Sequence, residues 1–235
     1  MSDTALSFED RRTAPRSSLV DAAYHAIKTS IRDGLFPPGF QGSELEIAER
    51  LGMSRTPVHQ AIIQLQAEGM VDLRTKRGVV ICALSPDDMR EVYDVIVAVE
   101  GMAAFLIASL PEERREPICL RLAALTAAGE AALEDDDLEV WAAKDGEFHA
   151  ALIEEAGNGR LKRIATVNLD QSHRARRLTL NLRPKPTPSI GEHRAIIAAL
   201  SAGRPEDARR AAQAHKENAR DLIMAILKRY DMRYL

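Results

Sequence analysis

Apolar positions along the first 84 residues recur at helical spacing in three segments and then form two short continuous runs. Helical recurrence predicts amphipathic helices, and short apolar runs bounded by turn residues predict strands. We expect helices over residues 17–33, 43–50 and 54–68, and strands over residues 71–73 and 79–81. The order of helix, helix, turn, helix and hairpin predicts a winged helix-turn-helix over residues 17–84, preceded by a mobile arm over residues 1–16.

Serine residues mark the expected start of each helix in this segment. Ser17 and Ser18 are placed to cap the first helix, and Ser54 precedes the third. Ser43 stands three residues before Glu46, which is the spacing of a capping box. The three helices therefore have start signals that agree with their apolar pattern.

From Ser85 onward the pattern is purely helical. Breakers rich in proline and glycine separate the apolar segments, and Ser85 is followed by a proline and two acids that suit a first helical turn. The expected helices cover residues 85–110, 112–128, 137–156, 159–180, 190–202 and 205–230. The sequence therefore predicts a mainly α fold, in which residues 85–235 form an antiparallel all-α bundle of six or seven helices.

Composition agrees with a soluble, mostly helical protein. Hydrophobic residues make up 46 % of the 235 residues, but aromatic residues only 4 %, which disfavours a sandwich or barrel. No apolar run approaches the roughly 20 residues needed to cross a bilayer, so we expect no membrane association. The start of the chain lacks the pattern of a secretory signal. With only Cys82 and Cys119, a disulfide framework is excluded and a cytoplasmic location is expected.

Net charge does not reveal a nucleic-acid partner. The formal charge is −3, and residues 1–84 contain ten basic and ten acidic side chains. The case for DNA binding must therefore rest on where the charges stand. In a helix-turn-helix, the N-terminal residues of the second helix reach the base edges in the major groove.

The residues at that position have suitable side chains. Arg55 can donate two parallel hydrogen bonds to a guanine, while Ser54 and Thr56 suit phosphate. One turn further on, His59 and Gln60 are expected to face outward, and glutamine is a natural adenine reader. At the wing, Lys76 and Arg77 precede Gly78 and follow Arg74, so this hairpin tip can hold the DNA backbone or enter the minor groove.

Several motifs in this segment resemble the GntR family of bacterial regulators. They are Ile31-Arg-Asp-Gly-Leu-Phe-Pro-Pro-Gly39, Glu44-Leu-Glu-Ile-Ala-Glu-Arg-Leu-Gly-Met-Ser-Arg-Thr-Pro-Val58, Glu68-Gly-Met-Val71 and Arg77-Gly-Val-Val80. The resemblance implies a DNA-binding transcription regulator. His59 and Gln60 depart from the arginine and the acid that the family usually has there, and Gly42 and Leu45 also differ from the usual residues.

Asp145 and His149 form the first part of a candidate metal site. They are four residues apart on an expected helix, so both face the same side, while His193 and His215 lie on two later helices. Three imidazoles and a carboxylate suit zinc, nickel, iron or manganese better than calcium or magnesium. Spacing alone leaves open that these are unrelated surface histidines or hydrogen-bonded structural histidines.

The helical part resembles the FadR-type branch of the family and its FCD effector domain. The resemblance rests on Ser85-Pro-Asp-Asp-Met-Arg-Glu-Val-Tyr93, Val99-Glu100, Asp145-Gly-Glu-Phe-His149, Gly157-Asn158, Glu192-His193 and His215. It implies that Asp145, His149, His193 and His215 bind a divalent transition metal, with zinc as the first candidate. It also implies a small carboxylate effector whose oxygens complete the metal coordination.

One arginine that the branch usually has is replaced by Ile96. Arg174 and Arg177, one turn apart on a later helix, could meet the effector anion instead. We therefore predict a ligand-responsive regulator, a repressor by family habit, that binds a palindromic operator as a homodimer. The alternatives are the same DNA reader with a metal-free dimerisation bundle, or a metal-dependent enzyme that uses the Asp145 cluster.

Overall fold

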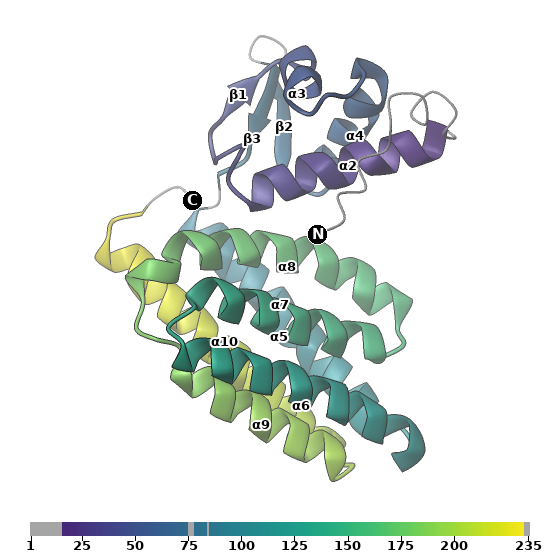
Figure 1. Ribbon diagram of the computed structural model, residues 1–235, viewed down its shortest axis with the longest axis vertical. Helices are drawn as coiled ribbons and strands as arrows, with labels where there is room; N and C mark the ends of the chain where they lie inside the picture. Colours follow the sequence, from purple (N-terminus) through teal and green to yellow (C-terminus); the bar gives the residue numbers. More distant parts are fainter. Residues whose placement is uncertain (1–15, 75–77, 84, 233–235) are drawn as a thin grey trace. The chain divides into compact units, whose positions relative to one another are not determined.

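The computed structural model describes residues 16–74, 78–83 and 85–232. The chain divides into two compact units, Met1–Ala83 and Leu84–Leu235, which Figure 1 shows as a small α/β unit and a larger helical unit. The predicted arm lies outside the described residues except for Arg16, which begins a helix. Each unit is described by itself below.

The first unit is a winged helix-turn-helix, as predicted. Its elements are α2 (Arg16–Arg32), β1 (Gln41–Gly42), α3 (Glu44–Arg50), α4 (Arg55–Ala67), β2 (Val71–Arg74) and β3 (Gly78–Ile81). The strands form an antiparallel sheet in the order β1-β3-β2, with Gln41 opposite Val80 and Leu73 opposite Val79. Strand β1 was not predicted, because two residues are too few to show a strand pattern.

The helix starts agree with the sequence at two of three positions. The Ser43 hydroxyl accepts a hydrogen bond from the Glu46 backbone N–H at 3.0 Å, and Ser54 stands at the N-cap position of α4, although its side chain makes no capping hydrogen bond. The prediction that Ser17 and Ser18 cap the first helix is wrong, since α2 already begins at Arg16 and both serines lie inside it. The local signal was misread because serine is also tolerated within a helix's first turn.

The core of the first unit forms where α2 packs against α4 and both cover the sheet. Ile27 of α2, Ile62 and Leu65 of α4 and Ile81 of β3 are fully buried in this core. Phe36, in the turn after α2, is also completely enclosed. The core fixes which side of α4 points inward, and therefore which side chains remain available at its outer face.

The described residues of the second unit form a bundle of six α-helices and one short 3-10 helix, within the predicted number. They are α5 (Pro86–Ala108), α6 (Glu112–Glu134), α7 (Leu138–Glu155), α8 (Gly159–Thr179), η1 (Leu180–Leu182), α9 (Thr187–Ser201) and α10 (Pro205–Arg229). Helix α6 extends six residues beyond the expected end, because it continues through Gly129 to the three aspartates at 135–137. Helix α9 begins three residues early, with Pro188 in its first turn.

Helix α5 is central to the bundle, since it packs against α7, α8, α9 and α10. Its buried residues Ala103 and Ile107 contribute to the main core together with Leu122 of α6, Phe148 of α7 and Ile196 of α9.

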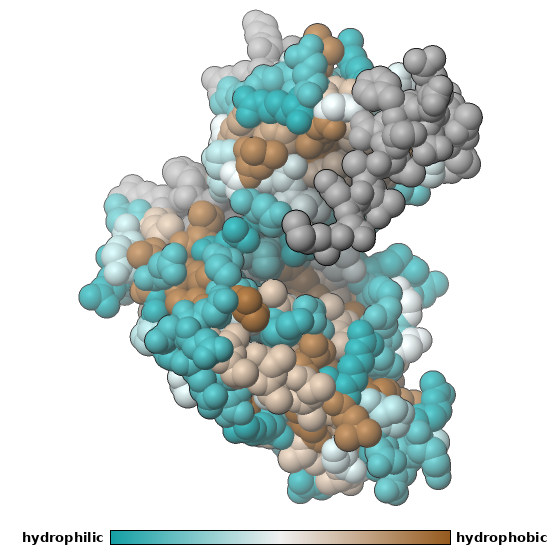
Figure 2. Space-filling model, viewed as in Figure 1, coloured by the Kyte–Doolittle hydropathy of each residue, from teal (hydrophilic) through white to brown (hydrophobic). Residues whose placement is uncertain are grey.

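On the face shown in Figure 2, hydrophilic residues are interspersed with hydrophobic ones. No described helix combines the length and the apolar character needed to cross a membrane.

Candidate DNA interface and metal centre

The outer face of α4 gathers the predicted DNA-reading side chains. Pro57, Val58, Ala61, Ile62 and Leu65 of this helix are buried. The exposed positions at and near its N-terminus are Ser54, Arg55, Thr56, His59 and Gln60. The periodicity of α4 thus places these five residues together, with the Arg55 side chain 70 % exposed.

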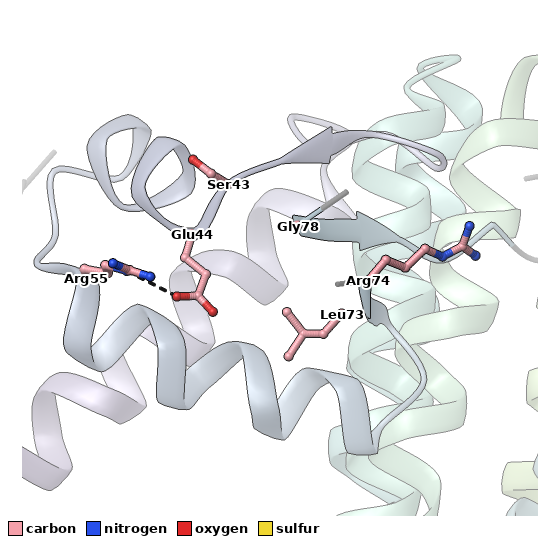
Figure 3. Close-up of a pocket in the computed structure, with 6 residues that line it drawn as sticks. All are labelled: Ser43, Glu44, Arg55, Leu73, Arg74 and Gly78. Carbon is pink, nitrogen blue, oxygen red and sulfur yellow. Dashed lines mark hydrogen bonds and ion pairs between the residues drawn. The ribbon is translucent and has the colours of Figure 1, made fainter. Parts of the chain in front are cut away.

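Glu44 also belongs to this surface, although no role was predicted for it. Its carboxylate accepts a hydrogen bond from Arg55 Nε at 3.3 Å and contacts His59 Nδ1 at 2.7 Å. Figure 3 shows the Glu44 and Arg55 side chains pointing toward each other from the starts of α3 and α4. Partial burial alone would raise the pKa of Glu44, but His59 and Arg55 lower it below its usual value. Glu44 therefore restrains two predicted base-reading side chains while it is ionised.

The wing is described only at its base. Gly78 opens β3 with φ +69°, and a Cβ atom there would lie 2.6 Å from the Gly42 carbonyl oxygen, so this position requires glycine. Lys76 and Arg77 lie outside the described residues, and their predicted DNA contacts stay predictions. At the end of β2, Arg74 Nε donates to Asp72 at 2.8 Å. A cleft beside these elements (Figure 3) is lined by Ser43, Glu44, Arg55, Leu73, Arg74 and Gly78.

The bundle brings the four predicted metal ligands together. Asp145 and His149 come from α7, His193 from α9 and His215 from α10, and all four are buried. Each offers one ligand atom, and these atoms lie within 4.8 Å of one another. Four atoms that share one tetrahedral ion at roughly 2.1 Å lie about 3.4 Å apart, so the side chains must move closer together to hold it.

Two glutamates orient the imidazole rings of this cluster. Glu100 Oε2 of α5 contacts His149 Nδ1 at 2.9 Å, and Glu192 Oε2 of α9 contacts His215 Nδ1 at 2.6 Å. Ionised carboxylates only accept hydrogen bonds, so both Nδ1 atoms carry the proton. The two Nε2 atoms lie 3.2 Å apart. When both rings are neutral, each Nε2 presents a lone pair to the other, and a cation between them removes the repulsion of the two lone pairs.

The ionisation of the acids suits a cation site. Burial would raise the pKa of Glu100, but His149 and Lys216 bring it down to about 2. Burial likewise opposes ionisation of Asp145, yet Arg176 and His149 hold its pKa well below the usual value. For His193, burial and the neighbouring His149 lower the pKa to about 2. The cluster therefore presents ionised carboxylates together with a neutral His193, the forms that bind metals.

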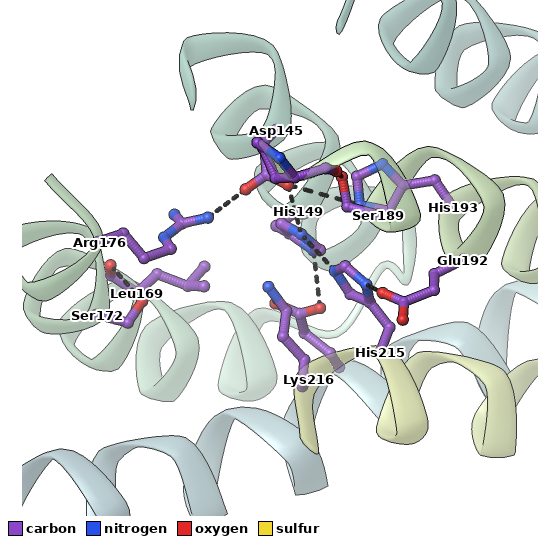
Figure 4. Close-up of polar contacts among 12 residues, drawn as sticks. Asp145, His149, Leu169, Ser172, Arg176, Ser189, Glu192, His193, His215 and Lys216 are labelled. Carbon is purple, nitrogen blue, oxygen red and sulfur yellow. Dashed lines mark hydrogen bonds and ion pairs between the residues drawn. The ribbon is translucent and has the colours of Figure 1, made fainter. Parts of the chain in front are cut away.

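Arg176 is the second residue that sequence reasoning missed. Its Nη1 donates to Asp145 Oδ2, while Asp145 Oδ1 lies 3.6 Å from His149 Nε2 and 3.7 Å from His193 Nε2. Figure 4 shows Arg176 reaching Asp145 from α8, on the side away from His193 and His215. The two oxygens of one carboxylate thus face an arginine and the histidine cluster.

The two arginines proposed for the effector occupy different environments. Arg174 is buried, with 3 % of its surface exposed. Arg177 is 43 % exposed in its side chain and forms an ion pair with Glu139 at 3.7 Å. The intervening Arg176 contacts the cluster through Asp145 of α7, whereas Arg177 pairs with Glu139 near the start of the same helix.

Fold and sequence together define the class of this protein as a helix-turn-helix transcriptional regulator. The chain matches the family model for bacterial regulatory proteins of the gntR family over residues 19–81, and the model for the FCD domain over residues 91–218. It belongs to the GntR family and carries an FCD domain, as the sequence motifs indicated. The matched relatives are transcriptional regulators rather than enzymes.

Two relatives illustrate this relationship. An uncharacterized HTH-type transcriptional regulator in the TAR-I ttuE-ttuC' intergenic region of Agrobacterium vitis is 49 % identical over 134 residues, which are 57 % of this chain and 78 % of the relative. A probable D-xylose utilization operon transcriptional repressor of Paenarthrobacter nicotinovorans is 30 % identical over 207 residues, which are 85 % of this chain and 86 % of the relative. The similarity to the second spans most of both chains.

Solved structures share the fold. E. coli McbR/YncC has a TM-score of 0.73 at 19 % identity, over 90 % of this chain and 98 % of that chain. A putative transcriptional regulator GntR from Rhodococcus sp. RHA1 has a TM-score of 0.70 at 22 % identity, over 88 % and 98 %. At these identities the similarity supports the architecture alone.

Proposed function

We propose that this regulator holds a divalent transition metal, with zinc as the first candidate, through Asp145, His149, His193 and His215. The observation that carries the proposal is the pair of facing Nε2 atoms of His149 and His215, 3.2 Å apart, whose Nδ1 atoms are both engaged by glutamates. Asp145 and His193 add the carboxylate and imidazole that complete a four-ligand set. When bound, the ion supplies a Lewis-acidic position that can accept a carboxylate oxygen.

In this proposal the helical unit senses a small carboxylate effector and the winged helix responds. An effector can shift the balance between two states of a regulator only by binding one state better than the other. The DNA contacts are assigned to Ser54, Arg55, Thr56, His59 and Gln60 on α4, and to Lys76, Arg77 and Gly78 on the wing. We further propose that the protein acts as a homodimeric repressor in the cytoplasm and binds a palindromic operator.

Metal analysis of the purified protein tests the first part. Wild-type protein should retain about one zinc ion per chain, while His149→Ala and His215→Ala should lose it. His25→Ala is the matched control, because His25 is an exposed histidine of the other unit. Equal metal content in all four proteins would overturn the assignment and favour a metal-free dimerisation bundle.

Selection from random-sequence DNA tests the reader. Wild-type protein should enrich a two-fold symmetric sequence, and Arg55→Ala should relax the preference at one base pair of each half-site. Loss of a bidentate arginine–guanine contact corresponds to about 1–3 kcal/mol of discrimination. An unchanged preference in Arg55→Ala would show that α4 does not read bases through this residue.

A further inference from the structure

The histidine cluster is closed to solvent, so an ion can reach it only when part of the bundle opens. Asp145, His149, His193 and His215 have at most 6 % of their surface exposed. Helices α5, α7, α8, α9 and α10 supply these residues and their polar partners. Segments outside regular helices open at a lower free energy than packed helices. The connection between α8 and α9, residues 180–186, is such a segment, and we call it the strap.

The strap covers a small apolar cluster that adjoins the histidine cluster. Leu180 of the strap is buried together with Trp141 of α7 and Ile190 of α9. Trp141 stands four residues before Asp145, and Ile190 stands three residues before His193. Residues three or four apart are neighbours on one side of a helix, so the two clusters are one helical turn apart on both helices. Figure 1 shows the α8–α9 connection at the end of the bundle where α6 ends and α7 begins.

Cationic side chains fasten the strap over Trp141. The Arg183 guanidinium lies over the Trp141 ring, 5.4 Å from its centroid, and Arg183 Nη2 donates to the Arg176 carbonyl oxygen at 3.2 Å. Lys185 forms an ion pair with Asp136 in the turn between α6 and α7. The side chains of Lys185 and Asp136 are 42 % and 83 % exposed, so dissolved salt screens their attraction. The outer fastening of the strap is therefore sensitive to ionic strength.

The closed position leaves Arg183 incompletely paired. Its buried Nε has no hydrogen-bond partner among the described residues. Burial and the neighbouring Arg176 lower the pKa of Arg183, so its positive charge is less stable here than in water. The attraction of Arg183 to the Trp141 ring is thus opposed by the cost of desolvating the guanidinium. The strap is held closed by the difference between these opposing contributions.

We propose that the strap is a gate that controls exchange of the metal ion between solvent and the histidine cluster. It opens when Arg183 leaves the Trp141 ring and Lys185 separates from Asp136, which uncovers the apolar cluster beside Asp145. The inference rests on the metal site proposed above and adds the route by which that site is filled. A gate changes the rates of metal binding and release together and leaves the equilibrium affinity unchanged.

Quenching of tryptophan fluorescence by acrylamide measures opening of the strap, because Trp141 is the single tryptophan of the chain. In the full-length wild-type protein, quenching should accelerate as salt is added. Lys185→Gln should be quenched up to about fivefold faster at low salt, since a surface ion pair is worth at most about that factor, and should lose this salt dependence. Lys162→Gln is the matched control, because Lys162 is an exposed lysine whose ion pair is with Glu154.

A double-mutant cycle assigns the effect to one ion pair. Asp136 has φ +58°, a conformation that asparagine also tolerates, so Asp136→Asn removes the charge without straining the turn. Asp136→Asn, Lys185→Gln and the double variant should be quenched equally fast, because each lacks the same interaction. Transfer of zinc to an excess of chelator should be accelerated by the same factor in all three proteins. Their zinc affinities at equilibrium should equal that of the wild type, whereas a merely structural defect would weaken them.

The outcomes separate the two proposals. A protein that holds no zinc would overturn the metal site, while faster quenching of Trp141 in Lys185→Gln would still show that the strap opens. If zinc binds but leaves Lys185→Gln and Lys162→Gln at the same rate, the metal site stands and the strap is not the entry route. If Trp141 is quenched equally in the wild type, Lys185→Gln and Asp136→Asn, the ion pair does not hold the strap closed and the inference is wrong.

Discussion

Glu192 offers a direct way to perturb the metal centre without removing a ligand. Its Oε2 accepts from His215 Nδ1 at 2.6 Å, and its Oε1 accepts from Asn218 Nδ2 at 2.7 Å. The side chain is 29 % exposed, so its replacement leaves no large buried defect. Glu100 makes the equivalent contact to His149, but its loss would also leave Lys216 buried without its carboxylate.

The expected magnitude follows from the role of such partners. Loss of a group that orients a metal-bound histidine typically costs 10–100-fold in metal affinity, or about 1.4–2.7 kcal/mol. Glu192→Gln keeps an oxygen that can accept from His215 and loses only the charge, so we expect a change near tenfold. Glu192→Ala removes the acceptor itself and should approach one hundredfold.

Competition with a zinc chelator of known affinity measures these constants. Glu130→Gln is the matched control, because Glu130 is a partly exposed helical glutamate whose ion pair is with Arg194 rather than with a histidine. Circular dichroism of each variant verifies that the bundle is folded. If Glu192→Ala bound zinc as tightly as Glu130→Gln, the hydrogen bond to His215 would have no role in metal binding, and the reasoning from ring orientation would be refuted.

Three further predictions concern stability and DNA recognition. At zinc concentrations near one hundred times Kd, bound zinc should stabilise the helical unit by about 2.7 kcal/mol. Since one kcal/mol shifts the Tm of a unit of this size by about 2–4 °C, removal of the zinc with a chelator should lower that Tm by roughly 5–10 °C. Calorimetry should find no such change in His149→Ala. Glu44→Gln should alter the base preference obtained by DNA selection, because Arg55 and His59 lose the carboxylate that restrains them. The salt dependence of binding should change by less than about one phosphate contact. An unchanged base preference would contradict a positioning role for Glu44. Ile62→Ala should destabilise the winged helix by about 2–5 kcal/mol in denaturant unfolding, whereas Ile63→Ala next to it should cost under about 1 kcal/mol, because Ile62 is fully buried and Ile63 is 48 % exposed.

The helices and strands of this protein, and the faces that its helices turn outward, could largely be predicted from its sequence. The winged helix, the six helices of the bundle and the outward face of α4 all follow from apolar periodicity and caps, which act within a few residues. Asp145 and His149 could be placed on one side of α7 for the same reason. Errors occurred where the local signal was weak, at Ser17 and Ser18 and at the two-residue strand β1.

Only the tertiary structure decided which side chains meet across elements. Glu44 contacts residues 11 and 15 positions away, Glu100 contacts a histidine 49 positions away, and Arg176 reaches Asp145 across 31 positions. Helical periodicity gives the direction of a side chain about its own axis, but not the crossing and offset of a neighbouring helix. For that reason the contact of Arg176 with Asp145 could not be predicted from the sequence, while the assignment of Arg174 and Arg177 to the effector stays a prediction.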